Sequence, residues 1–150
     1  MRIRILWCLM LGVVFLVLNR TSFHLNASRS LPERAFLVFN DLRPQKGDAV
    51  LIENLTVKET TYPSLIKCLV GLPGDTVIHR DQTLYVNTTK VGGLLETTKN
   101  GDFLTLLSEQ TIPEGFVFVA ASHPDSFDSR YQEFGLVPAH HLRGRAIGLF

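Results

Sequence analysis

One charged residue, Lys67, interrupts the apolar run from Leu65 to Val70, and the turn Gly71-Leu-Pro-Gly-Asp75 follows it. Burial disfavours a charged ammonium group and lowers its pKa, which is how a lysine can become a base. Deprotonating an unperturbed lysine at pH 7 costs roughly 4 to 5 kcal/mol, and burial can remove most of that cost. The alternative is a lysine that extends its amine to water or pairs with a carboxylate.

Short runs rich in β-branched and aromatic residues alternate with Gly, Pro and Asn turns, which predicts a mainly β domain. The polar segment 20–34 is predicted to be a loop, and residues 81–101 hairpins or an insertion at the edge of the domain. The predicted strands are 35–39, 48–53, 64–70, 76–79, 83–87, 103–107, 115–121 and 146–150.

Composition limits the classes of function. The chain has 150 residues, which suits one globular domain and one membrane segment. Lys and Arg number 15 against 14 Asp and Glu, so the chain lacks the basic excess typical of nucleic-acid binding and no nucleic acid partner is expected. Cys8 lies in the N-terminal apolar run and Cys68 in a predicted strand, which argues against a disulfide, and the histidines lack metal-ligand spacing.

Residues 5–18 are uncharged, with Arg2 and Arg4 before them and Arg20 after. As a helix they span only about 21 Å, against a hydrocarbon core of roughly 30 Å. The segment therefore fits either a retained anchor with flanking arginines that snorkel, or a cleaved signal peptide. We expect residues 1–20 to be this anchor or signal and 21–150 to be an exported domain, because Arg2 and Arg4 favour a cytoplasmic N-terminus.

Three motifs resemble the signal peptidase I family. The stretch Ile66 to Asp75 is similar to the box I-K-R-x-x-G-L-P-G-D, in which the lysine is the general base of a serine/lysine protease. The stretch Asn26 to Phe36 resembles N-x-x-x-S-x-P-x-G-x-Y of the conjugative-transfer branch, the TraF type, and assigns the nucleophile to Ser30. Arg34 replaces the glycine of that pattern, and Phe36 its tyrosine.

The same resemblance implies an oxyanion hole formed by the Ser28 hydroxyl and the backbone N–H of Ser30. The third motif, Ser122 to Tyr131, resembles the last box of the family, S-x-D-S-R-x-x-G-x-V-P. By this match Ser126 orients the amine of Lys67, and Asp128 pairs with Arg130. Taken alone, the Asp-Ser-Arg sequence would be a turn with a local ion pair.

Together the motifs imply a signal-peptidase/LexA-like β-barrel catalytic domain after one short transmembrane helix. The implied activity is that of a membrane-associated serine endopeptidase without a cofactor, which removes leader peptides from exported precursor proteins at the periplasmic side of a bacterial inner membrane. The TraF pattern favours maturation of a pilin for conjugation. The alternatives are a general housekeeping signal peptidase and a non-catalytic exported β-barrel binding module.

Overall fold

The computed structural model describes residues 7, 10–12, 19–26, 30–92 and 103–149, and its regular structure is almost entirely β, as predicted. The strands are β1 (Thr21–Leu25), β2 (Ala35–Phe39), β3 (Ala49–Val57), β4 (Thr60–Gly71), β5 (Thr76–Arg80), β6 (Thr83–Val86), β7 (Thr89–Gly92), β8 (Gln110–Thr111), β9 (Phe116–Ala120), β10 (Val137–Pro138) and β11 (Leu142–Gly148), with the 3-10 helix η1 (Ala139–His141) before β11.

Most of the expected N-terminal segment, residues 1–20, lies outside the described residues. Within the described part of the chain, no helix combines the length and apolar character needed to cross a membrane.

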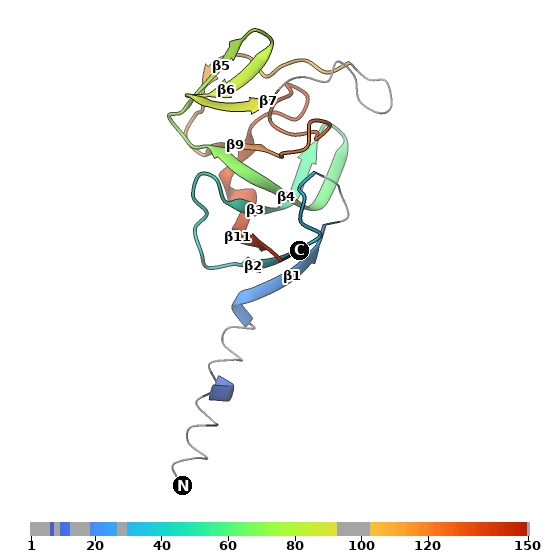
Figure 1. Cartoon of the computed structure of the whole chain (residues 1–150), viewed down its shortest axis with the longest axis vertical. Helices are drawn as coiled ribbons and strands as arrows, with labels where there is room; N and C mark the ends of the chain where they lie inside the picture. Colours follow the sequence, from blue (N-terminus) through green and yellow to red (C-terminus); the bar gives the residue numbers. More distant parts are fainter. Residues whose placement is uncertain (1–6, 8–9, 13–18, 27–29, 93–102, 150) are drawn as a thin grey trace.

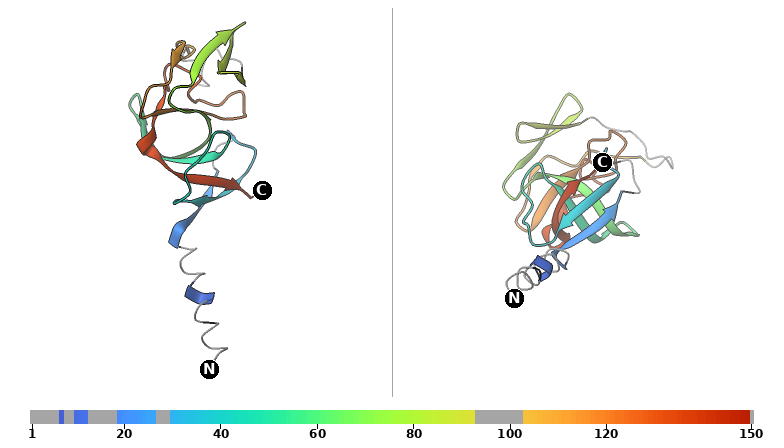
Figure 2. Two further views of the ribbon diagram at one scale, coloured as in Figure 1. Left: turned by 90° about the vertical axis from the view of Figure 1, so that its left-hand side faces the viewer. Right: turned by 60° about the horizontal axis from the view of Figure 1, so that its bottom comes forward.

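The strands form two antiparallel sheets. The larger has the order β1-β2-β11-β3-β4-β9-β10, and the smaller has the order β7-β6-β5-β8. Figure 1 shows β1 and the hairpin β5-β6 at opposite ends of the domain, and Figure 2 shows the larger sheet curling around its interior. The long hairpin β3-β4 forms the centre of the larger sheet, with eight residue pairs in register from Ala49↔Cys68 to Val57↔Thr60.

Strand β9 joins the cores of the two sheets because its sequence, Phe-Val-Phe-Val-Ala, is apolar on both faces. Val117 and Val119 pack in the core with Val50, while Phe118 and Ala120 pack with residues of the smaller sheet. A third apolar cluster lies beneath the segment that follows Ser30 and consists of Leu31, Phe36, Val38, Leu51, Ala121 and Ala146.

Two sequence predictions of local structure are wrong. Residues Thr21–Leu25 form strand β1 rather than a loop, since their backbone pairs with β2 although their side chains are largely polar. Residues 103–107 form no strand, because their backbone bonds go to a loop: Leu107 N–H donates to Arg130 O (2.9 Å) and Thr105 O accepts from Gln132 N–H (2.8 Å).

Candidate active site

Lys67 occupies an inward-facing position of β4, and its side chain is only 4% exposed. Burial lowers its pKa from 10.5 to about 8, with Arg130 adding to the decrease and the negative charge of Asp128 opposing it. A lysine of this kind is neutral in an appreciable fraction of molecules near neutral pH. The first of the two sequence interpretations, a buried amine, therefore fits the structure, and the amine does not extend to water.

The Lys67 amine lies between two serine hydroxyls. Its Nζ donates to Ser126 Oγ at 2.6 Å and lies 3.2 Å from Ser30 Oγ. These residues are 59 and 37 positions from Lys67 in the sequence, so the fold alone brings the three motifs together. A neutral amine within hydrogen-bond distance of a hydroxyl can accept its proton, and this arrangement activates serine as a nucleophile in serine/lysine pairs.

The segment that carries Ser30 is held by backbone and side-chain bonds on both sides. The Asn26 side-chain amide donates to Leu31 O (3.3 Å) and Glu33 O (2.9 Å). On the opposite side, His123 N–H donates to Ser30 O (3.2 Å), which joins this segment to the third motif. Ser28, the expected hydroxyl of an oxyanion hole, lies outside the described residues.

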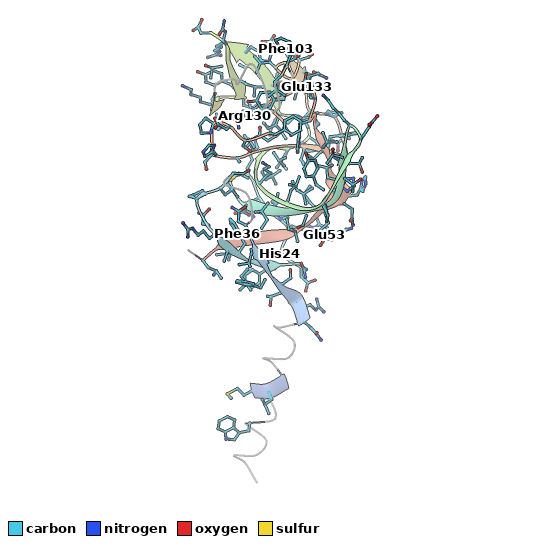
Figure 3. The ribbon with its side chains drawn as sticks, turned by 90° about the vertical axis from the view of Figure 1, so that its right-hand side faces the viewer. His24, Phe36, Glu53, Phe103, Arg130 and Glu133 are labelled. Carbon is cyan, nitrogen blue, oxygen red and sulfur yellow. The ribbon has the colours of Figure 1, made fainter. Side chains whose placement is uncertain are left out.

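Asp128 and Arg130 form a buried ion pair behind Ser126, in which Arg130 Nε donates to Asp128 Oδ1 at 2.8 Å and Nη2 to Oδ2 at 2.9 Å. Arg130 Nη2 also donates to the carbonyl oxygens of Ser126 (3.0 Å) and His123 (3.1 Å), and Asp128 Oδ2 accepts from Ala121 N–H (2.9 Å). Arg130 is buried, and Figure 3 shows it higher in the domain than Phe36 and His24. The pair thus fixes the backbone on both sides of Ser126.

Sequence reasoning missed a pocket between β1 and β4, about 360 Å³ in volume, whose lining includes Ile66, the residue before Lys67. It is lined by residues 24–26 of β1 and its end, and by Tyr62, Ser64, Leu65 and Ile66 of β4. Polar and apolar residues alternate from Ser22 to Leu25, which was the available sequence signal for strand β1, whereas no sequence signal indicated the pocket itself.

Comparison with known proteins finds several that are similar to this chain in sequence. A sequence profile described as "Signal peptidase, peptidase S26" matches residues 2–150. Signal peptidase I of Bacillus licheniformis is 33% identical over 114 residues, which is 71% of this chain and 59% of that protein. Signal peptidase I T of Bacillus subtilis strain 168 is 32% identical over 114 residues, 71% of this chain and 56% of that protein.

A signal peptidase I from Bacillus caldolyticus is 28% identical over 117 residues, with 70% of this chain and 61% of that protein aligned. The chain therefore spans about three fifths of the length of these curated relatives. A crystal structure of a signal peptidase I from Enterococcus faecalis V583 aligns with a TM-score of 0.44 and 31% identity, over 69% of this chain and 96% of that chain. From the profile match over almost its whole length, the chain belongs to the signal peptidase family, peptidase S26.

Proposed function

We propose that this protein is a serine endopeptidase that cleaves leader peptides from exported precursor proteins, with Ser30 as the nucleophile and Lys67 as the general base. The observation that carries the proposal is the buried amine of Lys67, 3.2 Å from Ser30 Oγ, with its pKa lowered to about 8. Membership of a peptidase family supports the same activity.

The catalytic steps follow from this geometry. Neutral Lys67 accepts the hydroxyl proton of Ser30, and Ser30 Oγ forms a bond to the carbonyl carbon of the scissile peptide. The Ser30 backbone N–H and the Ser28 hydroxyl stabilise the oxyanion. Collapse of this intermediate breaks the C–N bond, and the Lys67 ammonium gives its proton to the departing amine. Water, activated by Lys67, then hydrolyses the acyl ester, while Ser126 keeps the amine in position.

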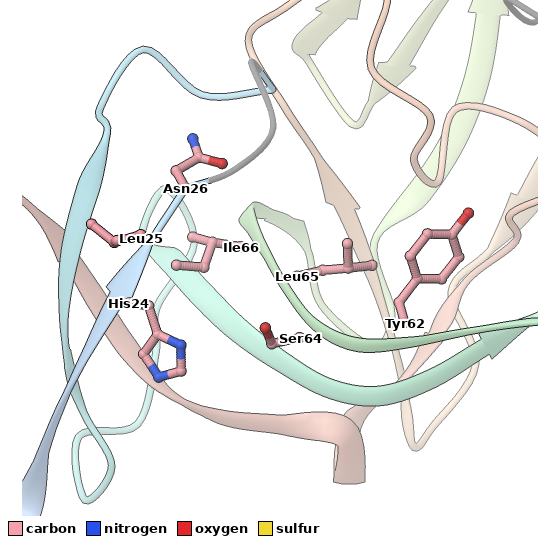
Figure 4. Close-up of a pocket in the computed structure, with 7 residues that line it drawn as sticks. All are labelled: His24, Leu25, Asn26, Tyr62, Ser64, Leu65 and Ile66. Carbon is pink, nitrogen blue, oxygen red and sulfur yellow. The ribbon is translucent and has the colours of Figure 1, made fainter.

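The pocket between β1 and β4 suits an extended peptide (Figure 4). In the described part of the chain, β1 pairs with β2 alone, and β4 pairs with β9 only from Cys68 onward. Each strand therefore has a backbone edge that a substrate segment can join by strand addition. Ile66, at one end of the pocket lining, directly precedes Lys67, and Asn26, which also lines the pocket, donates to the segment that carries Ser30. These two neighbours support a substrate segment that passes from the pocket to the proposed nucleophile.

The proposed location is the outer side of a bacterial inner membrane, with residues 1–20 as the anchor and 21–150 as the exported peptidase domain. Only 12 positions separate Leu18 from Ser30, so an anchor would hold the nucleophile near the membrane surface. The cleavage site of a precursor lies there as well, just beyond its own apolar segment. Accessibility of the catalytic domain to an added protease in spheroplasts tests this orientation.

The activity is tested by the mass of a candidate precursor after co-expression with the unmutated protein, Ser30→Ala or Lys67→Ala. We expect the leader to be lost only with the unmutated protein. Ser108→Ala and Lys90→Ala are matched controls, since both residues are exposed, and both should leave processing unchanged. Equal trimming with all variants would refute the catalytic assignment and favour the binding-module alternative.

Within the family we propose the conjugative branch, with a pilin precursor as the substrate. The pattern Asn26-x-x-x-Ser30-x-Pro32 supports this choice, and the two bonds from the Asn26 amide give its asparagine a physical role in bracing the segment. A general signal peptidase is the second candidate, favoured by the names of the matched Bacillus proteins. Processing of a pilin precursor but not of a panel of ordinary secretory precursors would separate the two, and loss of one further water from the product would indicate ring closure.

A further inference from the structure

The smaller sheet packs against Arg130, the arginine of the buried ion pair. Gly92 is the last residue of β7, and a Cβ atom built on it would lie only 3.2 Å from Arg130 Nη1. The backbone of Gly92 has a φ of +139°, which residues with a side chain rarely adopt. At this point β7 therefore places its backbone, with no side chain between, against the guanidinium group.

The smaller sheet also holds the main chain of Arg130. Leu107 N–H donates to Arg130 O (2.9 Å), and Leu107 O accepts from His79 Nε2 (2.7 Å). His79 belongs to β5. The smaller sheet thus contacts Arg130 in two ways, through β7 at the guanidinium and through β5 and Leu107 at the backbone.

Arg130 has little freedom to move away from β7. Its side chain is 2% exposed, and Nε and Nη2 donate to the Asp128 carboxylate and to the carbonyl oxygens of His123 and Ser126. A methyl group on Gly92 would have to displace the guanidinium by a few tenths of an ångström. Because a close-packed interior transmits strain, this displacement would lengthen the bonds that Arg130 makes.

Those bonds lead to both proposed catalytic residues. His123 O accepts from Arg130 Nη2, and His123 N–H donates to Ser30 O (3.2 Å). Ser126 O accepts from the same nitrogen of Arg130, and Ser126 Oγ accepts from Lys67 Nζ (2.6 Å). A shift of the guanidinium would therefore change how Ser30 and Lys67 lie relative to each other.

We propose that Gly92 is a positioning residue, and that β7 of the smaller sheet holds the Arg130 guanidinium where it fixes Ser126 and the segment of Ser30. The smaller sheet is thus a structural support of the active site, although it contributes no reacting group. This inference rests on the proposed peptidase function and explains how its reactive pair is kept in place.

The test compares Gly92→Ala with Gly115→Ala in the full chain. Gly115 also has a positive φ, +81°, so both variants strain the backbone, but a Cβ atom on Gly115 would have no atom within 4 Å. For Gly92→Ala we expect kcat to fall about tenfold with KM within about twofold, because small misplacements of reacting groups slow the chemical step. Gly115→Ala should keep the kcat of the unmutated protein, and an equal loss in both variants would overturn the proposal.

A direct measurement on Arg130 separates this inference from the peptidase function. The Nε–H of Arg130 exchanges slowly with solvent while it donates to Asp128 inside the protein, and NMR follows that exchange. It should be about tenfold faster in Gly92→Ala than in Gly115→Ala. Equal exchange rates would overturn the proposal whatever the cleavage results, whereas faster exchange in a protein that cleaves no peptide would count against the peptidase function alone.

If Gly92→Ala does not fold, His79→Ala provides the test, because it removes the bond to Leu107 O. Its matched control is His141→Ala, which removes a similar bond from His141 Nδ1 to Glu53 O (2.8 Å). We expect faster exchange of the Arg130 Nε–H and a lower kcat only in His79→Ala. Equal exchange rates and equal kcat in these two variants would overturn the role of the smaller sheet.

Discussion

At the scale of single residues, the environment of Lys67 determines what the site can do. With a pKa of about 8, roughly one molecule in ten has a neutral lysine at pH 7, against about one in three thousand for an unperturbed pKa of 10.5. The neutral amine that the proposed mechanism uses is therefore present without any external activator, and its abundance depends on pH.

The rate of peptide cleavage should consequently rise with pH. We expect kcat/KM to increase about tenfold between pH 7 and pH 9 and to level off above that, because deprotonation of Lys67 is complete about one unit above its pKa of about 8. The measurement is a pH profile from 6 to 10 with a peptide that has no titratable side chain. A rate still rising steeply at pH 10 would contradict a lowered pKa at Lys67.

Ser126 and Ser129 are two buried serines three positions apart with different roles. Ser126 Oγ accepts from Lys67 Nζ at 2.6 Å, whereas Ser129 Oγ accepts from the Val119 backbone N–H at 3.2 Å. We expect Ser126→Ala to lower kcat by about 10- to 100-fold with little change in KM, since a hydrogen bond to a charged group contributes about 1.5 to 3 kcal/mol.

Ser129→Ala is the control for Ser126→Ala. It should cost about 1 kcal/mol of stability and leave kcat near that of the unmutated protein. Steady-state kinetics and denaturant unfolding of both variants measure these effects. An equal loss of kcat in the two would mean that Ser126 acts through folding rather than through Lys67.

At the scale of elements, strands with strong apolar patterns could be predicted from the sequence and strands held mainly by their neighbours could not. The predicted strand 35–39 coincides with β2, and 76–79 falls within β5. Strand β1 was not predicted because its residues are polar or exposed, and its pairing with β2 holds it in the sheet. Residues 103–107 have the apolar content of a strand, but Leu107 is buried by a loop contact rather than by a sheet.

Gly71 ends β4, the strand that carries Lys67, at a register shift between β4 and β9 on the side toward the smaller sheet. A Cβ atom at this position would lie 2.5 Å from Ile112 Cδ1 and 2.9 Å from Phe118 Cβ. Gly71→Ala should therefore destabilise the fold by about 1 to 3 kcal/mol through overpacking. Denaturant unfolding measures the loss.

Ile112→Val removes the closest clashing atom and alone costs about 0.5 to 1.5 kcal/mol. In the double variant Gly71→Ala/Ile112→Val, the free energy of unfolding should fall by less than the sum of the two single losses, because the valine makes room for the new methyl group. Strict additivity would show that the clash with Ile112 is not the cause.

At the scale of the whole molecule, the site is assembled from three segments that are far apart in sequence. The motifs named Ser28, which lies outside the described residues, and five others: Ser30, Lys67, Ser126, Asp128 and Arg130. The structure brings these five into one connected group. The pocket could not be predicted in the same way, because it depends on the packing of β1 across β4. Local patterns identify reactive residues, whereas the surface that surrounds them depends on tertiary contacts.

The burial of Lys67 should also lower the free energy of unfolding of the domain. Below pH 8 the amine is protonated in both folded and unfolded chains, and a pKa lowered from 10.5 to about 8 corresponds to a penalty of about 3 kcal/mol. Between pH 8 and 10.5 the folded protein has lost this proton while the unfolded chain keeps it, so the Lys67 contribution to stability rises with pH. Above pH 10.5 the amine is neutral in both the folded and the unfolded chain, so its burial no longer lowers the free energy of unfolding.

Lys67→Met removes the charge and keeps an unbranched side chain. At pH 7 we expect this variant to be more stable than the unmutated protein by about 1 to 3 kcal/mol, the lower value allowing for the lost serine hydrogen bonds. Its advantage should disappear by pH 10.5. Burial raises the pKa of Cys68, which lowers stability above pH 9 in both proteins, and the charge of Lys67 opposes this increase only in the unmutated protein. Denaturant unfolding at pH 7 and pH 10.5 makes the comparison, and an advantage that is independent of pH would mean that packing, not charge, separates the two proteins.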